Sequence, residues 1–142
     1  MKTYLEACEH AYLLFSCPYF SFSEKKRLIR NKKYYPIDPG LRHAVTSTNN
    51  RDLGKSLELL IFLKLKQKYD LVFYWQEIHK GEVDFVTVDR NNSQAITPYQ
   101  VTWHGPEPRH EKALESFYNT FPQANEAVWI TRENAIEFLS IN

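Results

Sequence analysis

The chain has 142 residues, which suits one compact domain, or one domain with an appendage, because domains commonly run to about 100–200 residues. A hydrophobic fraction of 43% with only 4 glycines argues against a disordered or low-complexity chain. The net charge of +1 identifies no class of partner by itself, since a nearly neutral total can hide a charged patch.

No segment has the apolar length needed to span a bilayer, and the first residues lack the pattern of a secretory signal. Cys8 and Cys17 lack the paired spacing of a zinc site or a redox motif, so we expect free thiols in a reducing compartment. We therefore expect a cytoplasmic protein that has no membrane contact.

The first 50 residues are predicted to form an appendage. Apolar residues at spacings of three and four between Tyr4 and Phe15 indicate a helix. The aromatic runs CPYFSF (17–22) and KKYYPI (32–37) read as two strands of a wing-like β-ribbon, which the turn residues Asp38 to Gly40 close.

The charged tip of this predicted ribbon is basic and could neutralise phosphates, although a solvated loop is the simpler alternative. Its aromatic neighbours could stack nucleic-acid bases, but such residues more often belong to a core. The aromatic residues are Tyr19, Phe20, Phe22, Tyr34 and Tyr35, and the predicted nucleic-acid-binding residues are Lys25, Lys26, Arg27, Arg30, Lys32 and Lys33.

The polar segment 46–52 is predicted to separate this appendage, residues 1–50, from a main domain, residues 51–142. Asp52 is placed to cap a strong helix over residues 53–69, with Leu57, Leu60, Ile61 and Leu65 on its apolar side.

Three strands are then predicted at LVFYW (71–75), EVDFVTV (82–88) and YQVTW (99–103). The third strand is expected to begin its pairing at Tyr99, because Pro98 cannot donate to a ladder. A helix over residues 109–121, a strand at 126–131 and a short helix at 132–141 complete the order, which indicates an α/β fold with a sheet flanked by helices.

Polar residues interrupt this apolar pattern at three places. Glu58 intrudes on the apolar side of its helix, and a buried lone carboxylate is costly unless it is paired or binds a metal. Glu82 and Asp84 share a face of the second strand, as Gln100 and Thr102 do on the third, with His104 continuing that alternation.

If the helix packs on the sheet, Glu58, Asp84 and Gln100 can converge as oxygen ligands for Mg²⁺ or Mn²⁺. An ion held in this way would activate water and stabilise charge on a phosphodiester. The simpler alternative is an ordinary polar surface, in which Asp84 pairs with a lysine such as Lys55 or Lys112.

Three segments in this order, GKSLE (54–58), GEVDF (81–85) and PYQVTW (98–103), resemble the motifs of the PD-(D/E)XK, or restriction-endonuclease-like, nuclease superfamily. More narrowly, KKYYPIDPGLRHAV (32–45) together with residues 54–75 and GEVDF is similar to the C-terminal domain of an uncharacterised family of prokaryotic AAA-type ATPases. The resemblance covers about residues 4–131 and is most specific in YPIDPGL (35–41) and GEVDF.

The resemblance implies a restriction-endonuclease-like αβββαβ core with a mixed sheet, preceded in the family by winged-helix and ATPase regions. It implies that Glu58 is the helical acid, Asp84 the metal-binding aspartate and Gln100 the acid or amide of the third motif. Thr102 stands where active members carry a lysine. That lysine is expected to act on the attacking water and on developing negative charge, and a threonine has no charge to do so.

Lys80, Lys112 or His104 could replace the missing lysine. Two functions therefore stay open, namely a DNA-associated, metal-dependent nuclease with an impaired site, and a non-catalytic module that binds DNA or an ATPase domain in the same or another chain. No phosphate-binding GxxxxGK[ST] loop is present, so we expect no ATP site here.

Overall fold

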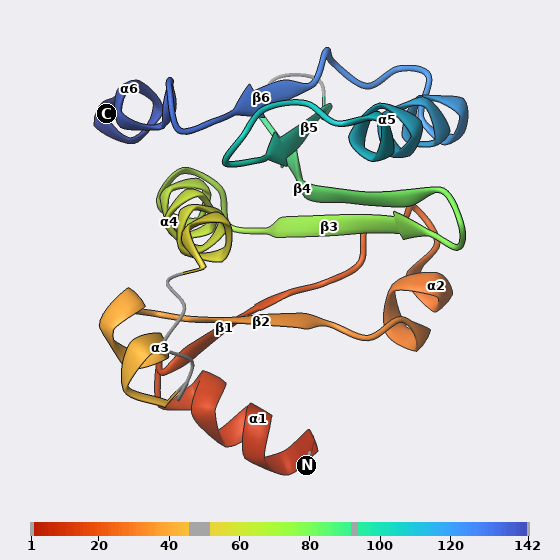
Figure 1. Cartoon of the computed structure of the whole chain (residues 1–142). Coiled ribbons are helices and arrows are strands. Elements are labelled where there is room, and N and C mark those ends of the chain that lie inside the picture. Colours follow the sequence, from red (N-terminus) through yellow and green to blue (C-terminus); the bar gives the residue numbers. More distant parts are fainter. Residues whose placement is uncertain (1, 46–51, 92–93, 142) are drawn as a thin grey trace.

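A computed structural model describes residues 2–45, 52–91 and 94–141 of the chain. It is a mixed α/β fold with a four-stranded sheet, in the order β3-β4-β5-β6, and a separate two-stranded sheet, β1-β2. Helices flank both sheets, and the chain runs from α1 beside the small sheet to α6 beyond the large one (Figure 1). No helix in the described ranges is long and apolar enough to cross a membrane.

The N-terminal part departs from the predicted helix and ribbon. Helix α1 (Lys2–His10) ends early, and Phe15 lies in strand β1 (Leu14–Cys17), which pairs antiparallel with β2 (Lys33–Pro36). The predicted ribbon is therefore correct in kind, but its first strand ends at Cys17, the first residue of the CPYFSF run.

The basic segment is not a ribbon tip but a short helix, α2 (Glu24–Ile29), because the hydroxyl of Ser23 caps it by accepting from the backbone N–H of Lys26. Likewise Asp38 does not close a turn. Its carboxylate accepts from the N–H of Leu41 at the start of helix α3 (Pro39–Val45).

The predicted main helix is confirmed as α4 (Leu53–Lys68), capped by Asp52, whose carboxylate accepts from the N–H of Lys55 at 3.0 Å. Its buried side includes Leu57, Ile61 and Leu65 as expected, but Leu60 is 39% exposed. Leu59 and Phe62 are buried instead.

The predicted order of elements after α4 is confirmed. Strands β3 (Val72–Glu77) and β4 (Gly81–Asp89) pair antiparallel, as do β4 and β5 (Ala95–Val101), whereas β6 (Val128–Ile130) pairs parallel to β5. Helix α5 (Pro108–Thr120) connects β5 to β6, and α6 (Ala135–Ser140) ends the described chain. The sheet is thus mixed, and the longest helices are α4 and α5.

The prediction that pairing in β5 begins at Tyr99 is wrong, because Pro98 lies opposite Val86 inside the strand. The carbonyl of Ile96 accepts from the N–H of Asn125, on the β6 side of the strand. Because backbone polar groups two residues apart point to the same side, those of Pro98 also face the β6 side. On that side the β6 ladder begins only at Tyr99, so the proline leaves no ladder bond unmade.

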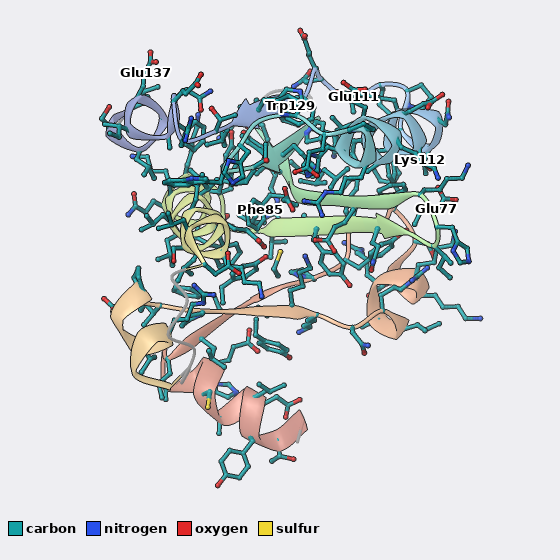
Figure 2. All side chains as sticks on the ribbon, in the orientation of Figure 1. Glu77, Phe85, Glu111, Lys112, Trp129 and Glu137 are labelled. Atoms are coloured by element: carbon teal, nitrogen blue, oxygen red, sulfur yellow. The ribbon has the colours of Figure 1, made fainter. Side chains whose placement is uncertain are left out.

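Strand β4 contains one extra residue relative to β3. Phe73 lies opposite Val86 and Trp75 opposite Val83, so two steps along β3 match three along β4. The resulting bulge lies at Asp84 and Phe85. Phe85 faces α4, where its ring centroid is 5.7 Å from that of Phe62 (Figure 2).

Residues from both predicted domains share one core. Tyr35 of β2 stacks on Phe62 of α4 at 4.3 Å, and Phe20 contacts the rings of Phe73, Phe117 and Phe121. Of the aromatic residues considered for base stacking, Tyr19, Phe20 and Tyr35 are buried, whereas Phe22 is 64% exposed. Of the predicted boundary segment 46–52, residues 46–51 lie outside the described residues.

Candidate functional site

A cleft of about 830 Å³ lies where α4 and α5 begin and where β4 and β5 separate. The carboxylates of Glu58, Glu82 and Asp84 line it, as do Lys55, His104, Arg109 and His110. The structure therefore brings together the acidic residues that the sequence placed on separate elements.

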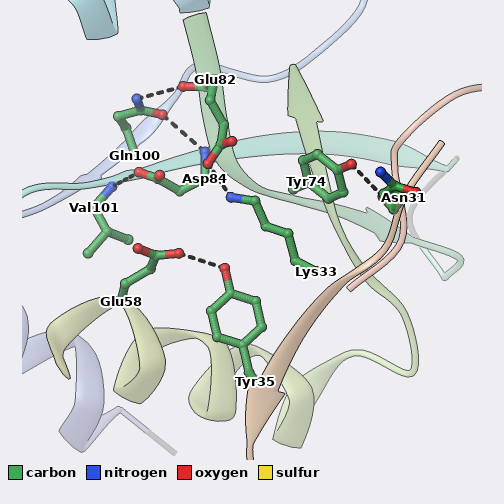
Figure 3. A network of polar contacts seen from close by, with 9 residues as sticks. All are labelled: Asn31, Lys33, Tyr35, Glu58, Tyr74, Glu82, Asp84, Gln100 and Val101. Carbon is green, nitrogen blue, oxygen red and sulfur yellow. Dashed lines mark hydrogen bonds and ion pairs between the residues drawn. The ribbon is translucent and has the colours of Figure 1, made fainter. Parts of the chain in front are cut away.

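Side chains connect β4 and β5 at the point where their ladder ends. The last paired residues are Phe85 and Tyr99, and beyond them the carboxylate of Asp84 accepts from the N–H of Val101 at 2.7 Å. The amide of Gln100 donates to the carbonyl of Glu82 at 3.0 Å and accepts from the N–H of Asp84 at 3.3 Å (Figure 3). These bonds fix Asp84 at the edge of the cleft.

Glu58 reaches the same place from α4. Its carboxylate accepts from the hydroxyl of Tyr35 at 2.6 Å and is directed toward Asp84 (Figure 3). Burial raises the pKa of the Tyr35 hydroxyl, and the Glu58 charge raises it further, so this tyrosine stays a donor. The buried ring of Tyr35 holds the carboxylate in position.

The environment of Asp84 disfavours its charged form. Burial is the largest cause and the neighbouring charge of Glu58 the next, and together they raise the pKa of Asp84 to about 7. The N–H of Val101 and the charge of Lys33 act in the opposite direction. A carboxyl with such a pKa can lose or gain a proton near neutral pH.

Lys33, which was predicted to bind nucleic acid, does not line the cleft itself, and its side chain reaches Glu82, which does. Its ammonium forms an ion pair with Glu82, and its charge interacts with Glu58 and Asp84 (Figure 3). Lys33 and Tyr35 share one face of β2 by alternation, which was the available signal. What the sequence could not reveal is that the side chain of Lys33 on β2 reaches Glu82 on β4.

The other predicted nucleic-acid residues lie on or just after α2, where Lys25, Lys26, Arg30 and Lys32 are exposed and Arg27 is partly exposed. The guanidinium of Arg30 packs over the ring of Tyr19 at 5.1 Å. They form a basic segment that leads along the chain directly into Lys33.

Thr102 is buried, its hydroxyl donates to the carbonyl of Gly105 at 2.9 Å, and its N–H donates to Ile130. Of its expected replacements, His104 is exposed at the cleft, whereas Lys80 and Lys112 are exposed and do not line it. The alternative pairing of Asp84 with Lys55 is not observed, since Lys55 pairs with Asp52 at 3.7 Å.

The described residues contain no group of three or more His, Cys, Asp and Glu side chains arranged to hold a metal. Two carboxylates, those of Glu58 and Asp84, do face one another across the cleft, and their repulsion contributes to the raised pKa of Asp84. Mg²⁺ is commonly held by one or two carboxylates together with water and substrate phosphates, so this pair fits such an ion. The amide of Gln100 is bonded to main-chain groups, and its role as a ligand stays a prediction.

No protein-family model and no solved structure matches the chain. An uncharacterised protein of Haemophilus influenzae is 27% identical to it over 111 residues, which are 78% of this chain but only 27% of that protein. The cleft is therefore the feature that indicates a function.

Proposed function

We propose that this chain is a restriction-endonuclease-like domain that binds a divalent cation and DNA in the acidic cleft and hydrolyses a phosphodiester there. The observation that carries the proposal is the convergence of Glu58 from α4 and Asp84 from β4 on one cleft. The order α4-β3-β4-β5-α5-β6 matches the αβββαβ core that this fold requires, which supports the proposal at the level of the fold.

Glu58 and Asp84 are the residues that would hold Mg²⁺ or Mn²⁺. When bound, such an ion would polarise the phosphodiester and lower the pKa of a water molecule. The protein's own residues fix the two carboxylates, through Tyr35 for Glu58 and through the N–H of Val101 for Asp84. Because these supports are already formed, little reorganisation is required when the site is filled.

Several features of the cleft favour a polyanion. Lys55 and Arg109 line it, each paired with the carboxylate that caps its helix, Asp52 for α4 and Glu107 for α5, and phosphates would compete with these carboxylates for both cations. The exposed cations of α2 precede Lys33 in the sequence and are a second basic segment that DNA could contact. DNA is therefore the substrate class that we propose.

The test compares the wild type with Asp84→Asn, which removes the charge but keeps an oxygen acceptor for Val101. With millimolar Mn²⁺, we expect the melting temperature of the wild type to rise and supercoiled or single-stranded DNA to be cleaved, with both effects lost in the variant. Asp89→Asn, at the other end of β4, is the matched control and should behave as the wild type. Mn²⁺ that neither stabilises the wild type nor supports cleavage would contradict the proposal.

A non-catalytic module is the second candidate, and the uncharged Thr102 favours it. In that case we expect DNA binding without cleavage, at an affinity that falls steeply as salt rises. Association with an ATPase domain belongs to the same proposal, since the Haemophilus influenzae relative extends well beyond the matched region. An affinity for DNA that ignores salt would contradict the DNA-binding form of this candidate.

A further inference from the structure

The site has a cation, but the cation comes from a different strand than the motif predicts. Thr102 is uncharged and its hydroxyl is bonded to Gly105, whereas Lys33 of β2 lies among Glu58, Glu82 and Asp84. The geometry points to Lys33 as the residue that performs, for the proposed phosphodiester hydrolysis, the role expected of a lysine at position 102. This inference rests on the proposed function.

Three contacts hold Lys33 where it is needed. Its backbone pairs with Cys17 at the end of the two-stranded sheet, and its stem leads the ammonium to the carboxylate of Glu82. The ammonium also lies 5.0 Å from the ring centroid of Tyr74, a favourable cation–π contact. Tyr74 is itself fixed, because its hydroxyl donates to the carbonyl of Asn31 at 2.5 Å.

The protonation state of Lys33 fits this role. Burial works to lower its pKa, but Glu82 first, and then Glu58 and Asp84, raise it above the ordinary value. The lysine is therefore a cation at neutral pH and cannot serve as a general base. It is suited to stabilising negative charge.

In the proposed reaction, the oxygen of water forms a bond to phosphorus as the bond from phosphorus to the leaving sugar oxygen breaks. One proton of the water leaves the attacking oxygen, and the departing sugar oxygen takes up a proton, so the products are a phosphomonoester and an alcohol. Negative charge builds on the non-bridging oxygens during this step. Lys33 would exchange its pairing with Glu82 for these oxygens and donate hydrogen bonds to them.

The decisive experiment measures DNA cleavage and Mn²⁺ affinity of Lys33→Met beside the wild type. Loss of one charge-stabilising donor should slow cleavage by about 100-fold or more. Mn²⁺ should bind about two- to tenfold more tightly, since a competing positive charge is gone. A catalytic lysine is indicated if cleavage slows while Mn²⁺ binding tightens. If Lys33 only supported the fold, its loss would weaken both cleavage and Mn²⁺ binding.

Two further variants make the test specific. Lys64→Met removes a similarly half-buried lysine of α4 that, unlike Lys33, has no ion pair with a described carboxylate, and it should cleave DNA as the wild type does. Lys33→Met combined with Thr102→Lys returns the charge to the motif strand and should recover at least tenfold of the lost rate. Lys33→Gln replaces Lys33→Met if the latter does not fold.

Cleavage by Lys33→Met at the wild-type rate, or an Mn²⁺ affinity that falls together with cleavage, would overturn the inference while leaving the proposed nuclease intact. A wild type that cleaves no DNA with any divalent ion would overturn both.

Discussion

At the scale of single residues, the site is a set of carboxylates whose mutual repulsion is only partly offset by hydrogen-bond donors and positive charge. Asp84 accepts one main-chain N–H and lies near one ammonium, yet burial and Glu58 still raise its pKa to about 7. The folded protein therefore holds a proton on this side chain at a pH where the unfolded chain has released it. That difference links stability to pH.

The sign follows from the raised pKa. Below about pH 4 Asp84 is protonated in both states, and from there up to about pH 7 only the folded state keeps the proton, so stability falls with rising pH in this window. In the wild type the unfolding free energy should fall by up to about 1.4 kcal/mol per pH unit in this window, and Asp84→Asn should abolish that fall. Urea denaturation of wild type and variant between pH 4 and 8 measures this.

Two variants control that measurement. Glu58→Gln should move the pH window of the wild type downward, because Glu58 is the nearest charge that raises the pKa of Asp84. Asp89→Asn should leave the pH dependence unchanged. Parallel curves for wild type and Asp84→Asn would show that the carboxyl titrates near its ordinary pKa.

At the scale of elements, the periodicity of the sequence predicted α4, the strands and α5, because each has a long apolar pattern. It failed for α2 and for the bulge in β4. Helix α2 buries none of its residues and depends on its cap, and the bulge in β4 has no signal in the alternation. The bulge matters for the site, because regular alternation would have placed Asp84 and Phe85 on opposite faces.

The contact between α5 and the start of β4 positions the cleft and depends on Gly81. This residue has φ +118°, and a Cβ there would lie 3.0 Å from the Cβ of Ala113 and 3.3 Å from the carbonyl oxygen of Arg109. We expect Gly81→Ala to cost about 2–4 kcal/mol of unfolding free energy, from backbone strain and overpacking together.

Gly105→Ala is the matched control for this prediction. Gly105 has φ +107° but open space around it, so the substitution should cost only the strain, about 1 kcal/mol. Chemical denaturation of both variants compares the two losses. Equal losses would mean that α5 does not pack closely on Gly81.

At the scale of the whole molecule, side chains of the first 45 residues pack into the same core as the rest of the chain. The segment after β1 adds to the edge of β3, where Phe20 donates its N–H to Tyr74 and Tyr74 donates to Pro18. β2 contributes Lys33 and Tyr35 to the site. Sequence reasoning identified the acidic residues by pattern, but it could not detect these contacts between distant segments.

We therefore expect the chain to unfold in one cooperative transition that depends on Phe20, although this residue lies outside every helix and strand. Phe20→Ala should lower the unfolding free energy by about 3–5 kcal/mol. Phe22→Ala, at a 64% exposed neighbour, should cost about 1 kcal/mol or less. Circular dichroism and tryptophan fluorescence would report two separate transitions if the N-terminal part folded independently.

The bulge in β4 also determines which changes in chain length the strand can accept. Deleting either Asp84 or Phe85 would leave both flanking stretches of β4 in their present register with β3, at the loss of either a site carboxylate or a core ring. Deleting any other residue of the paired strand would move every side chain beyond it to the opposite face. The bulge is therefore the place where this strand tolerates a change of length, and it holds one residue of the site and one of the core.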